Sequence, residues 1–169
     1  MINMDIQNRG KWDAEREDRS VLQPYFDLRN KAILHIGSNY KTMRSFAFLM
    51  IVADTGLSPE DVRTLEIENI DYAPSIGIMS CRPRGINEDS CISVTLHKST
   101  SEIIVAYLES RRAWLEEYSF DSPYLFPSRL TLSGIMPPEA INGIVEIASK
   151  ICKNKIDIDL IRETFGPPQ

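Results

Sequence analysis

The segment that decides the fold reads Thr55-Gly-Leu-Ser-Pro-Glu-Asp-Val-Arg-Thr-Leu-Glu-Ile-Glu-Asn-Ile-Asp71. It follows the apolar run FAFLMIVA, which predicts a buried helix over about residues 41–54 with Gly56 as its stop. Ser58 can accept a hydrogen bond from a free amide, and the proline and acids after it suit a first helical turn. The segment therefore predicts one helix end, a tight turn and a short helix over about residues 59–66.

The rest of the chain predicts mostly helices with one pair of strands. Apolar residues at three- and four-residue steps predict further helices over about residues 21–36, 99–118, 139–152 and 159–165. The helix over about residues 99–118 starts at a capping box, Ser99 to Glu102. Two short strands, 76–81 and 91–96, flank an irregular loop. The predicted fold class is α+β, mostly helical, with a small antiparallel β-sheet or hairpin.

Length and composition predict one domain. The chain has 169 residues, of which 43% are hydrophobic, enough for a sizeable core. Residues 1–20 mix acids and bases with scattered apolar residues and are expected to form a peripheral N-terminal arm. Residues 21–169 are expected to form the domain.

The charge balance excludes a strongly basic protein. Acidic residues number 24 and basic residues 19, so the net charge is −5. Residues 54–71 contain six acidic residues and one basic residue, Arg63, so the net charge of this segment is −5. The net charge of the whole chain is also −5. Any contact with nucleic acid must therefore come from a local basic patch.

Three cysteines, two histidines and the absence of long apolar runs exclude several other classes. The cysteines are odd in number and widely spaced, which argues against a disulfide framework or a zinc site, and we expect neither metal nor cofactor. No stretch resembles a signal peptide or a membrane span. We expect a soluble, cytoplasmic protein with no membrane partner.

With the segments that follow it, the region from Thr55 to Asp71 resembles the catalytic domain of the tyrosine recombinase (phage integrase) family. In that family an apolar helix ends at Thr-Gly-Leu-Arg, and a short helix with an acidic residue follows. A strand pair, a Tyr-Leu-Phe-Pro turn (here 124–127) and a long helix come next. Asp159-Leu-Ile-Arg-Glu-Thr-Phe165 then stands where the family has His-x-Leu-Arg-His-Thr-Phe. The resemblance covers about residues 40–165 and implies a helical bundle with a small sheet.

The resemblance also implies positions for the catalytic residues. Family members cleave DNA with a tyrosine, while two arginines and a histidine bind the phosphate and a lysine protonates the leaving oxygen. The first arginine falls on Ser58, the acidic residue on Asp61, the histidine on Asp159 and the second arginine on Arg162. Ser58 carries no charge, and a carboxylate at 159 repels a phosphate, so two of these positions have lost the family's chemistry.

Two further departures argue against strand cleavage. The lysine has no clear counterpart; Arg82 and Arg84 lie in the right region, but arginine is a poor acid. All six tyrosines precede Arg162, whereas the family's nucleophile follows it. We therefore expect no active catalytic residue, in a chain that is degenerate and C-terminally truncated relative to the family.

Simpler structural roles compete with these site roles. Ser58 is more readily explained as a helix cap. Arg162 suits either a phosphate or an ion pair with Asp159 one turn earlier. His97 is more often a surface residue than a ligand. The predicted DNA-binding residues are Arg82, Arg84, Lys98 and Arg162. The simpler explanation for basic side chains in such a loop is that they are only solvated.

We predict an integrase-like protein without cleavage activity that has a DNA-binding or regulatory role linked to DNA recombination or a mobile element. The expected partners are duplex DNA, bound weakly, and an intact recombinase or a second copy of the chain. One alternative is the N-terminal part of a longer or split active recombinase. Another is a protein-interaction module with no role on DNA.

Overall fold

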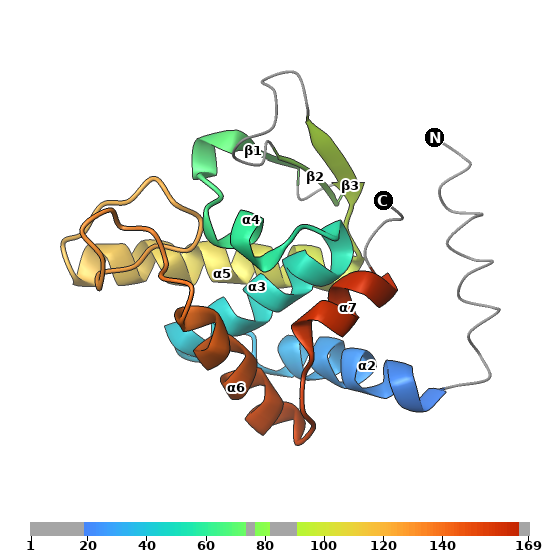
Figure 1. Cartoon of the computed structure of the whole chain (residues 1–169). Helices are drawn as coiled ribbons and strands as arrows, with labels where there is room; N and C mark the ends of the chain where they lie inside the picture. Colours follow the sequence, from blue (N-terminus) through green and yellow to red (C-terminus); the bar gives the residue numbers. More distant parts are fainter. Residues whose placement is uncertain (1–18, 74–76, 82–90, 166–169) are drawn as a thin grey trace.

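The computed structural model describes residues 19–73, 77–81 and 91–165 (Figure 1). The elements are α2 (Arg19–Leu34), α3 (Tyr40–Thr55), α4 (Pro59–Arg63), the 3-10 helix η1 (Ile67–Asn69), β1 (Ile70–Ala73), β2 (Ile78–Cys81), β3 (Ile92–Thr95), α5 (Lys98–Glu117), α6 (Ala140–Cys152) and α7 (Ile158–Phe165). The predicted mostly helical α+β class is confirmed. Residues 1–18 of the predicted arm and the loop with Arg82 and Arg84 lie outside the described residues, whereas residues 19 and 20 of that arm belong to α2.

Helix α3 is the centre of the bundle. It packs against α5, α6, α7 and α2, and Figure 1 shows it between the sheet at the top and α2 and α6 at the bottom. Its residues 46–53 are all buried, as the unbroken apolar run predicts. Asn39 caps the helix by accepting a hydrogen bond from the amide of Thr42 at 3.0 Å.

The sheet has three antiparallel strands in the order β1-β2-β3, one more than the sequence predicted. Tyr72 on β1 lies opposite Met79 on β2, which lies opposite Val94 on β3. Met79 is only 2% exposed, so the inner face of the sheet contributes to the core. The sequence pattern missed β1 because four residues carry little periodicity, and pairing with β2 decides their conformation.

Helix α4 ends at Arg63, earlier than the predicted Glu66. Beyond it the chain extends, since the carbonyl of Leu65 accepts a 2.8 Å hydrogen bond from the amide of Leu125 and Glu66 forms a bridge with Tyr124. Tyr107 on α5 anchors the same loop by donating to the carbonyl of Leu125 at 2.7 Å. These contacts hold α4 and the loop after α5 together.

Candidate functional site

The turn after α3 is held by its own hydrogen bonds. Gly56 has φ of 69°, and its amide donates to the carbonyl of Val52 at 3.0 Å. The Thr55 hydroxyl donates to the carbonyl of Ile51 at 2.6 Å and accepts from the amide of Leu57 at 3.2 Å. Because a positive φ is readily adopted only by glycine, the glycine is what lets the helix end and reverse here.

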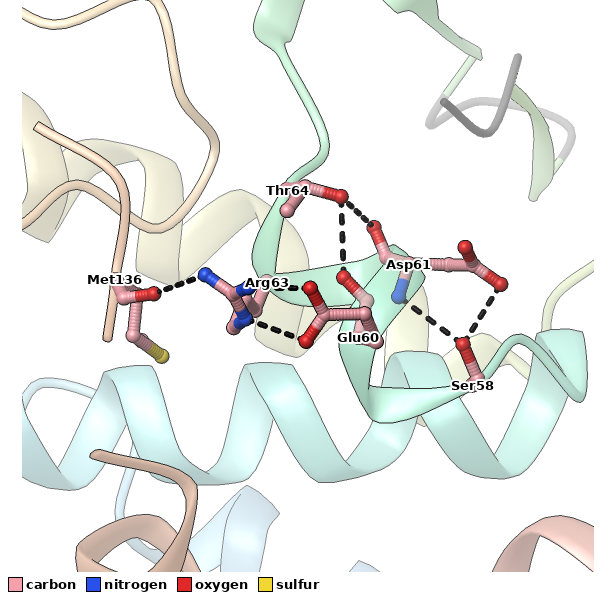
Figure 2. Close-up of polar contacts among 6 residues, drawn as sticks. All are labelled: Ser58, Glu60, Asp61, Arg63, Thr64 and Met136. Atoms are coloured by element: carbon pink, nitrogen blue, oxygen red, sulfur yellow. Dashed lines mark hydrogen bonds and ion pairs between the residues drawn. The ribbon is translucent and has the colours of Figure 1, made fainter. Parts of the chain in front are cut away.

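Ser58 is the N-cap of α4, as predicted. Its Oγ accepts from the amide of Asp61 at 3.1 Å and donates to Oδ2 of the same residue at 2.7 Å. Figure 2 shows the two side chains pointing toward each other at the start of the helix. The hydroxyl is therefore engaged as both donor and acceptor within α4, and Asp61 is engaged with it.

The opposite side of α4 carries a second polar contact. Arg63 pairs with Glu60 through Nε, at 2.7 Å, and through Nη2, while its Nη1 donates to the carbonyl of Met136 at 2.7 Å (Figure 2). The hydrogen bond from Arg63 lowers the pKa of Glu60. Arg63, the only basic residue of the acidic segment, thus ties α4 to the chain before α6 and is not available as a phosphate ligand.

Arg162 reaches the turn from α7. Its Nε donates to the carbonyl of Gly56 at 2.8 Å, two residues before Ser58. Within the described residues, neither Nη atom forms a hydrogen bond, and no ion pair joins Arg162 to Asp159. Asp159 is exposed in the first turn of α7. Of the two roles considered for Arg162, the local ion pair is absent among the described residues, and Arg162 instead bonds to the turn two residues before Ser58, the other position that the resemblance assigns to an arginine.

A buried ion pair that the sequence analysis missed lies at the same end of α3. Asp54 Oδ1 accepts from Nη2 of Arg29 at 3.2 Å and from the hydroxyl of Tyr25 at 3.4 Å. Its Oδ2 accepts from the amide of His97 at 2.9 Å. The two charged side chains are only 12% and 7% exposed, so this carboxylate joins α2 and the start of α5 to α3.

Burial, together with the charges in this cluster, shifts the pKa values of Arg29 and His97. Burial lowers the pKa of Arg29, and Asp54 opposes that shift by attraction and hydrogen bonding. Burial and the positive charge of Arg29 lower the pKa of His97, again opposed by Asp54. His97 therefore favours its neutral form more strongly than a free imidazole does.

His97, and not the predicted Ser99, begins α5. Its Nδ1 accepts from the amide of Ser99 at 3.2 Å and lies 2.7 Å from the Ser99 hydroxyl. The predicted cap is wrong by two residues, and the amide of His97 is held by Asp54, which fixes the backbone just before Lys98. Lys98, a predicted DNA-binding residue, is exposed in the first turn of this helix.

Across residues 19–73, 77–81 and 91–165, no group of three or more His, Cys, Asp or Glu side chains is placed to hold a metal ion. None of the described helices is long and apolar enough to cross a bilayer.

Comparison with known proteins shows similarity at the level of the fold. The sequence matches no protein-family model and no curated protein. Among solved structures, XerA recombinase matches with a TM-score of 0.58 and 21% identity over 82% of this chain. XerH site-specific recombinase, bound to its difH substrate in a pre-cleavage complex, matches with a TM-score of 0.58 and 15% identity, again over 82%. The chain has a recombinase-like fold.

The chain spans 47% of the XerA recombinase chain and 39% of the XerH chain. The likeness covers the helical bundle with its small antiparallel sheet, as the resemblance of the sequence to tyrosine recombinase catalytic domains implied. In this recombinase-like fold, α7 brings Arg162 to the turn that precedes Ser58.

One sequence signal pointed to the buried pair that was missed. Asp54 is the only carboxylate of α3 and directly follows its buried apolar run at residues 46–53, and buried carboxylates need a partner. The partner itself, Arg29, lies 25 residues earlier on another helix. No local pattern identifies it, because only the packing of α2 on α3 brings the two together.

Proposed function

We propose that this chain is a recombinase-like protein that contacts the DNA backbone without cleaving it and acts as a regulator or accessory factor in DNA recombination. The observation that carries the proposal is the state of Arg162. Its Nε is held by Gly56, while both Nη groups have no hydrogen-bond partner among the described residues. A guanidinium held in one orientation with free donors suits a phosphate oxygen.

The absence of cleavage is proposed from the neighbours of Arg162. Ser58 offers only a neutral hydroxyl that is already bonded to Asp61. Asp159, on the same helix as Arg162, adds a negative charge that disfavours a pentacoordinate phosphate. Each lost cationic contact costs several kcal/mol of transition-state stabilisation, on the order of 2.7–4 for one such donor.

Binding is expected to be weak, insensitive to sequence and strongly dependent on salt. Four basic residues are proposed to contact phosphates: Arg82, Arg84, Lys98 and Arg162. None of the described helices is proposed to contact base edges, so the sequence of the DNA is not read. The net charge of −5 repels the DNA backbone at long range and weakens binding. The XerH structure contains a DNA substrate, which supports a DNA partner for a chain with the same fold.

The test is a titration of generic duplex DNA at two salt concentrations, with two matched variants. Arg162→Gln removes the proposed phosphate contact, and Arg112→Gln removes the same charge from an exposed position on α5. We expect the salt slope of log Kobs to fall by about 0.9 for the first variant and to stay unchanged for the second. No binding by the wild type at low salt would contradict the proposal and favour the protein-interaction module.

A second test addresses cleavage. On nicked suicide duplex DNA, we expect no covalent adduct with the chain. An adduct through any tyrosine would contradict the proposal and favour the alternative of a longer or split active recombinase. One observation favours this alternative: the chain spans only 47% and 39% of the two solved recombinase chains.

A further inference from the structure

The loop between α5 and α6 exposes two leucines. Leu130 is 89% exposed and Leu132 is fully exposed, which makes them the most exposed large apolar side chains among the described residues. Single exposed leucines are ordinary on protein surfaces, but two on one loop form a small apolar projection. We call residues 128–135 the leucine loop.

The leucine loop is held in place by its own contacts. The amide of Ser128 donates to the carbonyl of Gly134 at 2.9 Å, and the hydroxyl of Thr131 donates to the carbonyl of Ile135 at 2.7 Å. At its base, the guanidinium of Arg129 lies 3.9 Å from the centre of the Tyr118 ring. The leucines are therefore presented to solvent by an ordered backbone, which lowers the entropy cost of docking them.

A small apolar cavity lies between η1, β1 and α5. Its volume is about 100 Å³, smaller than an engineered 150 Å³ cavity that accepts benzene, and it is suited to one branched aliphatic side chain. Its walls include Ile67, Ile70, Tyr72, Ile104, Leu108 and Leu125. Ile67 is 38% exposed, so the cavity opens to the surface beside η1.

The charges around the two features are complementary. The edge of the cavity at residues 66–73 carries Glu66, Glu68 and Asp71 and no basic residue, and the last two are exposed. The leucine loop carries Arg129 and no acidic residue. Opposite charges around an apolar contact favour its formation and specify its orientation.

We propose that the partner of both features is a second copy of this chain, with the leucine loop of each copy docked in the cavity of the other. Leu125 forms a wall of the cavity and lies three residues before the leucine loop, so one stretch of chain supplies both features. A two-fold axis lets both contacts form at once. The dimer is transient, because two leucines and a rim of charges cover less surface than a stable interface needs.

This inference does not depend on the proposed function, and sedimentation equilibrium over a range of protein concentrations tests it. We expect a reversible dimer for the wild-type chain. The Leu130→Ser/Leu132→Ser variant and, separately, Ile67→Ser should each raise the dissociation constant about tenfold or more, because each removes apolar burial from the contact. All three positions are exposed, and circular dichroism checks that the fold is retained.

Leu34→Ser is the matched control. Leu34 is 74% exposed at the end of α2, so its replacement removes a comparable apolar surface away from the leucine loop. We expect the dissociation constant of this variant to equal that of the wild type. A wild-type chain that stays monomeric up to its solubility limit would overturn the proposal. So would a dimer whose dissociation constant is unchanged by the loop variant or by the cavity variant.

Discussion

The Nε atom of Arg162 donates a 2.8 Å hydrogen bond to the carbonyl oxygen of Gly56, a residue 106 positions earlier in the chain. This contact fixes α7 against the end of α3 and places a cation beside the turn that begins α4. It is the structural relationship on which the candidate site depends.

Gly56→Ala should destabilise the protein by about 1 kcal/mol or more, because a side chain at φ of 69° is strained. Gly143→Ala, within α6, is the control; a Cβ there meets no atom within 4 Å, so this change should stabilise the protein by about 0.5–1 kcal/mol. Urea unfolding measures both. Equal effects at the two positions would show that the turn does not depend on the conformation of Gly56.

Ser58→Arg should tighten binding of generic duplex DNA about tenfold, since one charge-assisted hydrogen bond contributes about 1.5–3 kcal/mol. Ser58→Gln is the control, because it also loses the cap but adds no charge. Both variants should lose about 1 kcal/mol of stability. If arginine and glutamine at this position bind DNA equally, the turn does not face the phosphate that Arg162 is proposed to contact.

Asp54→Ala should destabilise the protein by about 3–5 kcal/mol, because Arg29 is left as a buried cation without its partner. Replacing both residues, by Arg29→Met together with Asp54→Ala, should cost clearly less than the sum of the single changes. Chemical unfolding of the three variants measures this coupling. Additive effects would mean that the two charges do not depend on each other.

The stability of the protein should rise with pH near the pKa of His97. Its pKa is lowered in the folded state by burial and by Arg29, so the unfolded chain binds the proton more tightly. The contribution is fully present above the ordinary pKa of about 6.5 and is lost as the pH falls through the lower folded-state value. Protonation of Nδ1 also removes the acceptor that caps α5.

The measurement is the free energy of unfolding between about pH 5 and 8. His97→Asn is the control, because asparagine caps a helix and does not titrate. We expect the wild type to lose stability relative to this variant as the pH falls. A constant difference between the two proteins would contradict a titrating cap.

Local signals in the sequence determined the elements around the turn. The apolar run predicts α3, Gly56 predicts its end, and Ser58 predicts the start of α4, and all three features are confirmed. Each depends on atoms within four residues of one another, either through backbone hydrogen bonds or through a side chain that caps its own helix. Such interactions are already specified by the order of residues along the chain.

Only the tertiary structure decided which distant residues meet there. Arg162 bonds to Gly56 and not to Asp159, Arg29 joins Asp54, and the amide of His97 is held by that same carboxylate, which moves the start of α5. The strand β1 likewise exists because β2 lies beside it. The three hydrogen bonds join residues that are 25 to 106 positions apart. Their formation depends on how the helices pack around α3, and a local pattern carries no information about that packing.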